Sequence, residues 1–418
     1  MTRIFVASFL FLLIISTSAQ EVRKSPVYAN DTAYRAMLLR FEEEAIEKRK
    51  LLLEEWENAN ADSVFKVNFS NLYFEEVPDI SRFRNLKVIE GGSNKITVLP
   101  KSTFVSDSLQ RLVFRYNEIK RVRFRSSSTI THVDLSKNKL KKVPRSIKKL
   151  KHLRQLDLSD NQLKKIPRFL RKCDNLQEIT LNFNQLELSE RSVRNLAHIP
   201  VILLAGNKLS KLPENIGELT AARKLNFSVN ELSDVPSTFA NLDSLTSVIF
   251  YKNQFSEIPP EIFSLKSLEE LDFYYNQIDE IPDEVGELTN LEQLFLSFNS
   301  ISTLPQSISG LQNLKYFYIH HNKLVIVPDW ILLLSKLERL DLSYNKIMAL
   351  PDLSQIATLK EVDLQDNQIN SFPWKLFEKE NMDMLLISNN PLILNEDERE
   401  FLEKWVSDQD PSRVWLVY

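Results

Sequence analysis

Most of the chain follows one short pattern of apolar and polar positions that returns every 21 to 23 residues. One unit, residues 153–163, reads L-x-x-L-x-L-x-x-N-x-L, and a degenerate unit begins at Val64. The asparagine of this frame falls at Asn94, Asn117, Asn138, Asn161, Asn184, Asn207, Asn230, Asn253, Asn276, Asn299, Asn322, Asn345, Asn367 and Asn390. The array spans residues 64–394 and holds about 15 units. A fixed period of this length predicts a solenoid of stacked coils rather than several globular domains.

Within each unit, the alternation of apolar and polar residues predicts a short strand with one face turned inward, as at Leu156 and Leu158. Such a strand cannot bury its apolar face alone, so the next unit adds a parallel strand about 4.8 Å away and closes a continuous core. The asparagine follows the strand, where its amide both donates to and accepts from backbone groups that the turn leaves open. Strands are more closely spaced than the bulkier outer segments, so we expect the stack to curve around them.

The frame resembles the leucine-rich repeat family. Most units continue after the asparagine as L-x-x-L-P-x-x-I-x-x-L, as in residues 209–219, and this 23-residue subtype is similar to repeats of bacterial surface proteins and of scaffolds such as Scribble. The resemblance implies an α/β fold, a curved solenoid with parallel strands on the concave face and an irregular, 3-10 or helical convex face. It also implies a binding scaffold that holds a protein partner on the concave face.

The segments before and after the array are predicted to cover the open ends of the stack. In residues 20–63 we expect a helical cap with one apolar face, made of Tyr34, Leu38, Phe41, Ala45, Leu52 and Trp56. A coiled-coil oligomerisation helix is the alternative for this segment. Residues 395–418 are expected to form the second cap. There, Asn395 and Glu398 favour a helix start, Phe401, Leu402 and Trp405 face the last repeat, and the apolar tail favours a final strand.

Residues 1–19 have the pattern of a secretory signal peptide, with Arg3 ahead of an apolar stretch and small residues at Thr17 and Ala19. The pattern predicts a secreted, cell-surface or periplasmic protein, and an uncleaved membrane anchor is the alternative. No second apolar stretch of spanning length follows, so no transmembrane segment is expected after cleavage. Asn-x-Ser/Thr sequons occur at Asn30, Asn68 and Asn226 and matter only in a eukaryotic host.

Composition argues against catalysis. The chain has one cysteine, five histidines and six glycines, which exclude an intrachain disulfide and a Cys-based zinc site and argue against Gly-rich phosphate loops. Cys173 falls in an apolar slot of the frame and is expected to be a buried small hydrophobe. We therefore expect no enzyme activity, no cofactor and no metal. With 53 basic and 56 acidic residues, the net charge of −3 does not indicate nucleic-acid binding.

Aromatic residues gather at the concave strand positions and at the strand exits between Asn253 and Asn345. With the charged residues among them, they form the predicted concave patch: Tyr251, Glu270, Asp272, Tyr274, Tyr275, Phe295, Phe298, Tyr316, Tyr318, His320, Arg339, Asp341 and Tyr344, with His321 also at an exit. Exposed apolar area of this extent is uncommon on monomers and favours a protein partner. A carbohydrate-binding or adhesion module is the alternative function, and ladders that only stiffen the sheet are the alternative role for the rings.

Charge is distributed unevenly. Residues 111–172 hold 20 Lys and Arg against four acids, whereas residues 253–292 hold eleven acids and one lysine. The predicted basic surface comprises Arg111, Arg115, Lys141, Lys142, Lys148 and Lys149, most of which we expect on the rim and convex side. Three interpretations remain open: an anionic partner such as a polysaccharide, lipid headgroups or nucleic acid; a solvated face with no partner; and head-to-tail contact between two copies.

Overall fold

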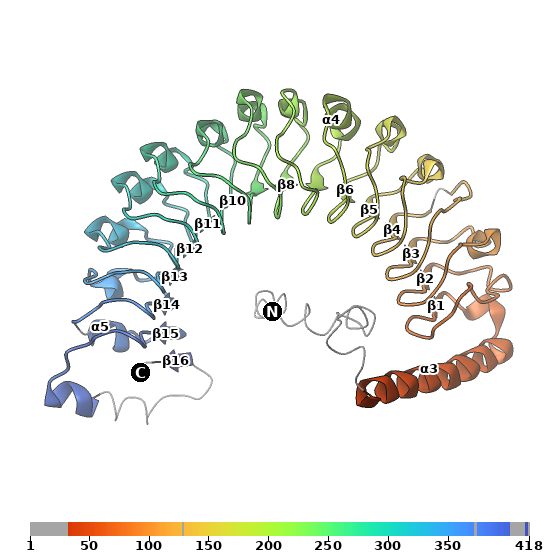
Figure 1. The fold of residues 1–418 in the computed structure, drawn as a ribbon, viewed down its shortest axis with the longest axis horizontal. Helices are drawn as coiled ribbons and strands as arrows, with labels where there is room; N and C mark the ends of the chain where they lie inside the picture. Colours follow the sequence, from red (N-terminus) through yellow and green to blue (C-terminus); the bar gives the residue numbers. More distant parts are fainter. Residues whose placement is uncertain (1–31, 128, 372–373, 402–413, 417–418) are drawn as a thin grey trace.

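The computed structural model describes residues 32–127, 129–371, 374–401 and 414–416. Sixteen three-residue strands form one parallel sheet in which strand order follows chain order. They are β1 (Lys66–Asn68), β2 (Val88–Glu90), β3 (Arg111–Val113), β4 (His132–Asp134), β5 (Gln155–Asp157), β6 (Glu178–Thr180), β7 (Val201–Leu203), β8 (Lys224–Asn226), β9 (Ser247–Ile249), β10 (Glu270–Asp272), β11 (Gln293–Phe295), β12 (Tyr316–Tyr318), β13 (Arg339–Asp341), β14 (Glu361–Asp363), β15 (Met384–Leu386) and β16 (Val414–Leu416). The sheet lines the inner side of an arc, which confirms the predicted curved solenoid (Figure 1). The predicted signal segment 1–19 lies outside the described residues.

The strands pair in register, so equivalent positions of successive units lie side by side. Glu270 of β10 pairs with Gln293 of β11, which pairs with Tyr316 of β12. The middle residue of each strand, such as Leu271 or Leu294, is buried in one core that runs the length of the array. Because side chains alternate along a strand, the residues on either side of it point to the concave surface.

The asparagine ladder forms as predicted. The Asn161 amide donates to the carbonyl oxygens of Leu135, Leu158 and Ser159 at 3.0, 3.1 and 3.0 Å, and its side-chain oxygen accepts from the Leu140 amide at 2.9 Å. The same pattern recurs at Asn253 and at Asn345. Each asparagine therefore joins its own turn to the coil before it. The residue before the asparagine adopts a left-handed conformation, with φ of 58° at Tyr275 and 52° at Tyr344.

The outer rim of the arc carries short 3-10 turns that begin after prolines. Examples are η2 (Lys101–Phe104), η3 (Arg145–Lys149), η4 (Arg168–Lys172), η5 (Ile216–Glu218) and η6 (Ser237–Asn241). Proline suits the residue before such a turn because its φ is already fixed near −65°. Between η4 and η5, residues 187–199 contain no proline, and an α-helix, α4 (Glu190–Leu196), forms there instead. Ser189 caps α4 by accepting a hydrogen bond from the Ser192 amide at 3.3 Å.

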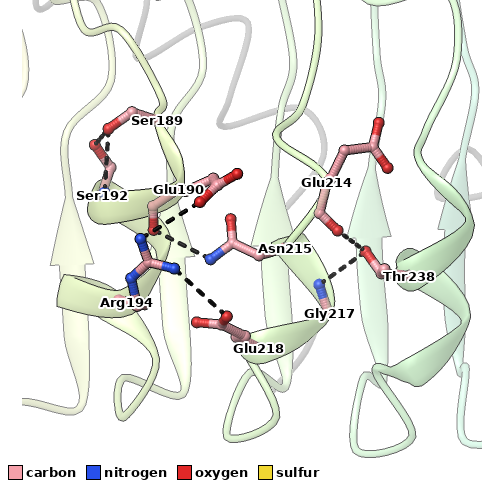
Figure 2. Close-up of polar contacts among 9 residues, drawn as sticks. All are labelled: Ser189, Glu190, Ser192, Arg194, Glu214, Asn215, Gly217, Glu218 and Thr238. Carbon is pink, nitrogen blue, oxygen red and sulfur yellow. Dashed lines mark hydrogen bonds and ion pairs between the residues drawn. The ribbon is translucent and has the colours of Figure 1, made fainter.

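Polar side chains connect neighbouring turns on this convex face (Figure 2). The Arg194 guanidinium lies between two carboxylates, 3.4 Å from Glu190 and 3.8 Å from Glu218. The Asn215 amide donates to the Glu190 carbonyl at 3.1 Å, and the Thr238 hydroxyl donates to the Glu214 carbonyl. On the convex face around α4 and η5, the Arg194 guanidinium is therefore paired with carboxylates of the described chain.

A long helix, α3 (Thr32–Asn58), covers the first coil (Figure 1). Trp56 is buried and makes edge contacts with the rings of Phe69 and Phe83, with centroids 6.1 and 5.9 Å apart. Ala45 is buried as predicted and Leu52 packs against the core, but the prediction for Phe41 is wrong, because its side chain is 49% exposed. Phe41 lies one turn before Ala45, so the buried face of α3 does not extend from Ala45 back to Phe41.

The far end of the array begins with the predicted helix start. The Asn395 amide donates to the Glu398 carboxylate at 2.7 Å, and the Glu398 amide donates back to the Asn395 side-chain oxygen at 2.9 Å. This reciprocal pair is a capping box with asparagine in place of serine or threonine. Phe401 contacts the ring of Trp374, which belongs to the short helix α5 (Trp374–Phe377), and β16 is the predicted final strand. Leu402 and Trp405 lie outside the described residues.

None of the helices in the described ranges combines the length and apolar character that a membrane span requires.

Candidate functional site

The concave patch lies on β9 to β13 and on the turns that follow these strands. Two groups of rings form there. One group occupies the strand exits and consists of Tyr275, Phe298, His321 and Tyr344, which we call the exit ladder. The other lies over the strand ends and consists of Tyr251, Tyr274, Phe295, Tyr318 and His320, which we call the inner rings.

The exit ladder is a continuous stack. Its ring centroids are 4.1, 3.9 and 4.1 Å apart in order from Tyr275 to Tyr344, with interplanar angles of 12°, 14° and 22°. The two middle rings, Phe298 and His321, therefore have both faces covered by neighbours. Solvent reaches their edges, and the terminal residues Tyr275 and Tyr344 are the most exposed, at 42% and 48%.

The inner rings close over a small residue. The ring centroids of Tyr274 in the β10 coil and His320 in the β12 coil are 5.4 Å apart, although the β11 coil lies between them. The β11 residue at this position is Ser297, which is fully buried and whose hydroxyl has no hydrogen-bond partner. A side chain without bulk at this position leaves room for the rings to meet above the strand.

A second part of the inner rings lies two residues earlier in the frame, at the last residues of β11 and β12. Phe295 stacks on Tyr318 at 5.0 Å, and the Arg339 guanidinium lies 5.1 Å from the Tyr318 ring centroid. Arg339 also pairs with Glu361 of β14 at 2.9 Å. Sequence analysis did not include Glu361 in the patch, although it lies six residues before Asn367, which is a concave strand position of the frame.

Three of the predicted patch residues do not join the rings. The described ring contacts do not include Tyr316. Glu270 turns toward the preceding strands, where its carboxylate accepts from Ser247 at 2.5 Å and pairs with Lys224 at 3.0 Å. Asp341 is buried, and its carboxylate accepts from the Ser343 hydroxyl at 2.8 Å. The Glu270 and Asp341 carboxylates therefore bond polar groups of the strands and turns instead of contributing to the aromatic surface.

Burial makes the patch less charged than its sequence suggests. It raises the pKa of the Asp272 carboxyl to about 7, despite a hydrogen bond from the Tyr274 amide that lowers it. Burial also raises the pKa of Tyr318 to about 12 and lowers the pKa of His320 and of His321. Near neutral pH both histidines are therefore uncharged, and the rings present a largely apolar surface.

An open hollow of about 620 Å³ runs along the exit ladder. Its aromatic wall is the ladder itself, and its other lining residues are Asn299, Asn322, Asn345, Lys346 and Asp366. Lys346 and Asp366 place one charge of each sign beside the rings. Sequence analysis overlooked both, because Asp366, at a strand exit, and Lys346, just after Asn345, lie beyond the stretch between Asn253 and Asn345 in which the aromatic residues gather.

The predicted basic surface is spread over two faces. Arg111 and Arg115 are exposed on the concave side at β3, whereas Lys148 and Lys149 lie on η3 at the outer rim. Lys141 and Lys142 are exposed in the segment between them and η3. The six residues therefore do not form one surface, and only the convex lysines cluster.

The part of the chain that the structure describes holds no cluster of three metal-ligating side chains. Cys173 is buried, and burial raises its thiol pKa to about 11, which leaves it protonated and unreactive at neutral pH.

Two family models match the chain: one described as a leucine-rich repeat region over residues 271–388, and one described as leucine rich repeat over residues 128–186. No curated protein sequence matches significantly. A solved leucine-rich repeat protein of Leptospira interrogans is 29% identical, with a TM-score of 0.73, and the match covers 86% of this chain and 97% of that one.

Two further solved structures share the architecture. The plant peptide hormone receptor RGFR1, solved in complex with RGF2, is 27% identical with a TM-score of 0.57, and the match covers 78% of this chain and 56% of the receptor. An internalin of Listeria monocytogenes, 20% identical with a TM-score of 0.54 over 89% of this chain and 93% of the internalin, shares the fold. The repeat frame, the parallel sheet and these matches agree that the chain is a leucine-rich repeat protein.

Proposed function

We propose that the chain is a non-enzymatic scaffold that binds a protein partner along the concave patch, through a peptide segment seated against the exit ladder. The observation that carries the proposal is the stack of four rings whose edges face an open hollow. Rings that only stiffened the sheet would not need to leave Tyr275 and Tyr344 nearly half exposed.

The stacking favours a peptide over a sugar. A sugar packs its C–H face on the face of an aromatic ring, because the ring face is the electron-rich side. In the exit ladder both faces of Phe298 and His321, and one face each of Tyr275 and Tyr344, are covered by neighbouring rings, so the side of the stack presents ring edges. Ring edges are electron-poor and suit carbonyl and carboxylate oxygens, which a peptide backbone supplies at regular intervals.

The similarity to RGFR1 supports this proposal, because that receptor was solved in complex with RGF2. The match covers about half of the receptor, so it bears on the solenoid and not on the remainder of that protein. The hollow beside the exit ladder also contains Lys346 and Asp366, which give a peptide one partner for each sign of charge.

A library of random peptides displayed on phage tests the proposal. The purified chain is expected to select peptides, and the double variant Tyr275→Ala, Tyr344→Ala should bind the selected peptides about 30-fold more weakly, since the loss of two half-exposed rings at about 1 kcal/mol each totals about 2 kcal/mol. The matched control is Phe65→Ala, Phe183→Ala, which removes two rings that are each 50% exposed but lie outside the patch. Its affinity should stay within about twofold of the wild type.

Other outcomes of this experiment count against the proposal. Equal loss in both double variants would mean that the peptides bind exposed rings in general. Selection of no peptide, together with a glycan-array signal that disappears in the Tyr275→Ala, Tyr344→Ala variant, would replace the protein partner with a carbohydrate.

We propose further that residues 1–19 direct export. The charged start, apolar stretch and small residues at Thr17 and Ala19 support this assignment. Expression of the full chain in a secreting host, followed by amino-terminal sequencing, should return a mature protein that begins at Gln20. A protein retained in the cell with Arg3 intact would contradict it.

A further inference from the structure

After the degenerate first unit, which also has no such turn, one repeat of the array shows no 3-10 or helical turn on its convex side in the residues that the structure describes there, 118–127 and 129–137. The unit between Asn117 and Asn138 is 21 residues long, the shortest of the frame, and has no proline after its asparagine. Where other units form a 3-10 turn, Ser127 pairs with Leu150 as a parallel bridge, and the Phe124 amide donates to the Ser146 hydroxyl at 2.9 Å.

The missing turn leaves a recess of about 540 Å³ on the convex side. Its lining consists of two serines, Ser126 and Ser127, and four lysines: Lys148 and Lys149 at the end of η3, Lys151 just after it, and Lys172 at the end of η4. We call these six residues the convex recess. The turns beside it add Arg145, Arg168 and Arg171, all exposed.

The positive charge of the convex recess is not balanced by the described chain. None of its four lysines has a carboxylate within ion-pair distance among the described residues. Acidic residues of 111–172 have other partners. Glu118 pairs with Lys139, and on the concave side the Asp134 and Asp157 carboxylates accept hydrogen bonds from the Ser136 and Ser159 hydroxyls. Beside α4, by contrast, Arg194 lies between two carboxylates (Figure 2).

The surroundings of the convex recess limit the class of ligand. Between residues 99 and 182 the described chain exposes no large hydrophobic side chain. A single-stranded nucleic acid would need rings on which its bases could stack, and a peripheral membrane contact gains from apolar side chains that enter the bilayer. Lysine ammonium groups and serine hydroxyls instead donate hydrogen bonds, and they suit ligands that bind through anionic oxygens alone.

We propose that the convex recess binds a linear sulfated or phosphorylated polysaccharide, whose sulfate or phosphate groups are held by Lys149, Lys151 and Lys172. The row of arginines on η3 and η4 extends the positive surface beyond the recess, as a polymer longer than one sugar unit requires. This surface lies on the outer side of the arc, opposite the concave patch. The chain is therefore able to attach to a polyanion while the concave patch holds its own partner.

Titration with a size-defined heparin oligosaccharide at physiological salt tests the proposal. The triple variant Lys149→Ser, Lys151→Ser, Lys172→Ser should bind about tenfold more weakly, since each exposed ion pair contributes about 0.5 kcal/mol. The matched control, Lys208→Ser, Lys211→Ser, Lys323→Ser, removes three exposed lysines outside the recess and should stay within about twofold of the wild type. Hyaluronan of equal length, which carries no sulfate, should bind much more weakly than heparin.

Four results would overturn the proposal. The first is an equal loss of heparin binding in the two triple variants, which would indicate general charge attraction. The second is no heparin binding even at low salt. The third and fourth are tighter binding to phosphatidylserine vesicles, or to single-stranded DNA of equal charge, than to heparin, which would assign the surface to a membrane or to nucleic acid.

Discussion

The basic segment, residues 111–172, and the aromatic segment, residues 251–344, share their strand and asparagine framework and differ in their surfaces. Both have three-residue strands in register, an asparagine with three donated bonds at each turn, and a left-handed residue before it. In the basic segment the concave positions hold Arg, His, Gln and Asp, and in the aromatic segment they hold rings. The inward residues and the asparagine thus specify the fold, and the outward residues are free to specify what each region contacts.

Two coils, one in each segment, differ at the serine two residues before the asparagine, although Ser343 of the aromatic segment bonds Asp341 as Ser159 bonds Asp157. In the basic segment Ser159 is held by the Asp157 carboxylate, to which its hydroxyl donates at 2.7 Å. In the aromatic segment Ser297 has no such partner, because Phe295 stands where the aspartate would be, and rings close above it. A serine at this position therefore stabilises the turn in the coil of Asn161 and leaves room for rings in the coil of Asn299.

The largest expected effect tests whether the backbone is shared. Asn161→Ala in the basic segment and Asn253→Ala in the aromatic segment each leave buried carbonyl and amide groups without partners, so each should lower the free energy of unfolding by about 3 kcal/mol. Urea denaturation of the two variants measures this. A loss in one segment more than twice that in the other would mean that the surface residues contribute to the fold.

A smaller effect concerns buried carboxyl groups. Burial raises the folded-state pKa of Asp272 to about 7, above the value of about 3.9 in an unfolded chain, so the native state holds a proton that the unfolded state releases. Its contribution is fully present below pH 4 and is lost as the pH rises to about 7. Asp272→Asn, which keeps the acceptor for the Tyr274 amide, should therefore raise stability at pH 8 by on the order of 2 kcal/mol and have little effect at pH 4.

Asp157 in the basic segment provides the comparison. Burial and the neighbouring Asp134 raise the pKa of Asp157 to about 6, a smaller shift than at Asp272. Thermal denaturation at pH 4 and pH 8 should give a smaller gain for Asp157→Asn than for Asp272→Asn. A gain at pH 8 that is equal in the two variants, or one that persists at pH 4, would contradict the assigned cause.

The smallest expected effect has opposite signs in the two segments. Ser159→Ala removes the hydrogen bond to Asp157 and should destabilise the protein by about 1 kcal/mol. Ser297→Ala removes a buried hydroxyl that has no partner and should stabilise it by up to about 1 kcal/mol. Chemical denaturation of both variants at one pH measures the difference. Destabilisation by Ser297→Ala would show that its hydroxyl has a partner in solution.

The frame alone predicted the array, its period, the asparagine ladder and the capping box at Asn395 and Glu398, because these follow from inward residues and backbone hydrogen bonds. It also predicted which coils place rings side by side. It did not predict that Glu270 would turn toward Lys224, or that Tyr274 would meet His320 across Ser297. Those outcomes depend on side-chain rotamers, which a repeat pattern does not determine.

The helical cap and the convex recess show two further limits. Apolar spacing placed Phe41 on the buried face of α3, but how much of that face is buried depends on the position of the helix in space. The 21-residue unit was visible in the sequence, yet its consequence, a coil without a convex turn, required the neighbouring turns to be placed around it.

Each strand of the sheet contacts the strand before it and the strand after it, and no coil of the described array reaches across the arc to another. When the two tips are pulled apart, the displacement is therefore shared among all the junctions in series, and each needs to tilt only slightly. The molecule should behave as an elastic spring whose opening widens or narrows at little energetic cost while every hydrogen bond of the ladder stays intact.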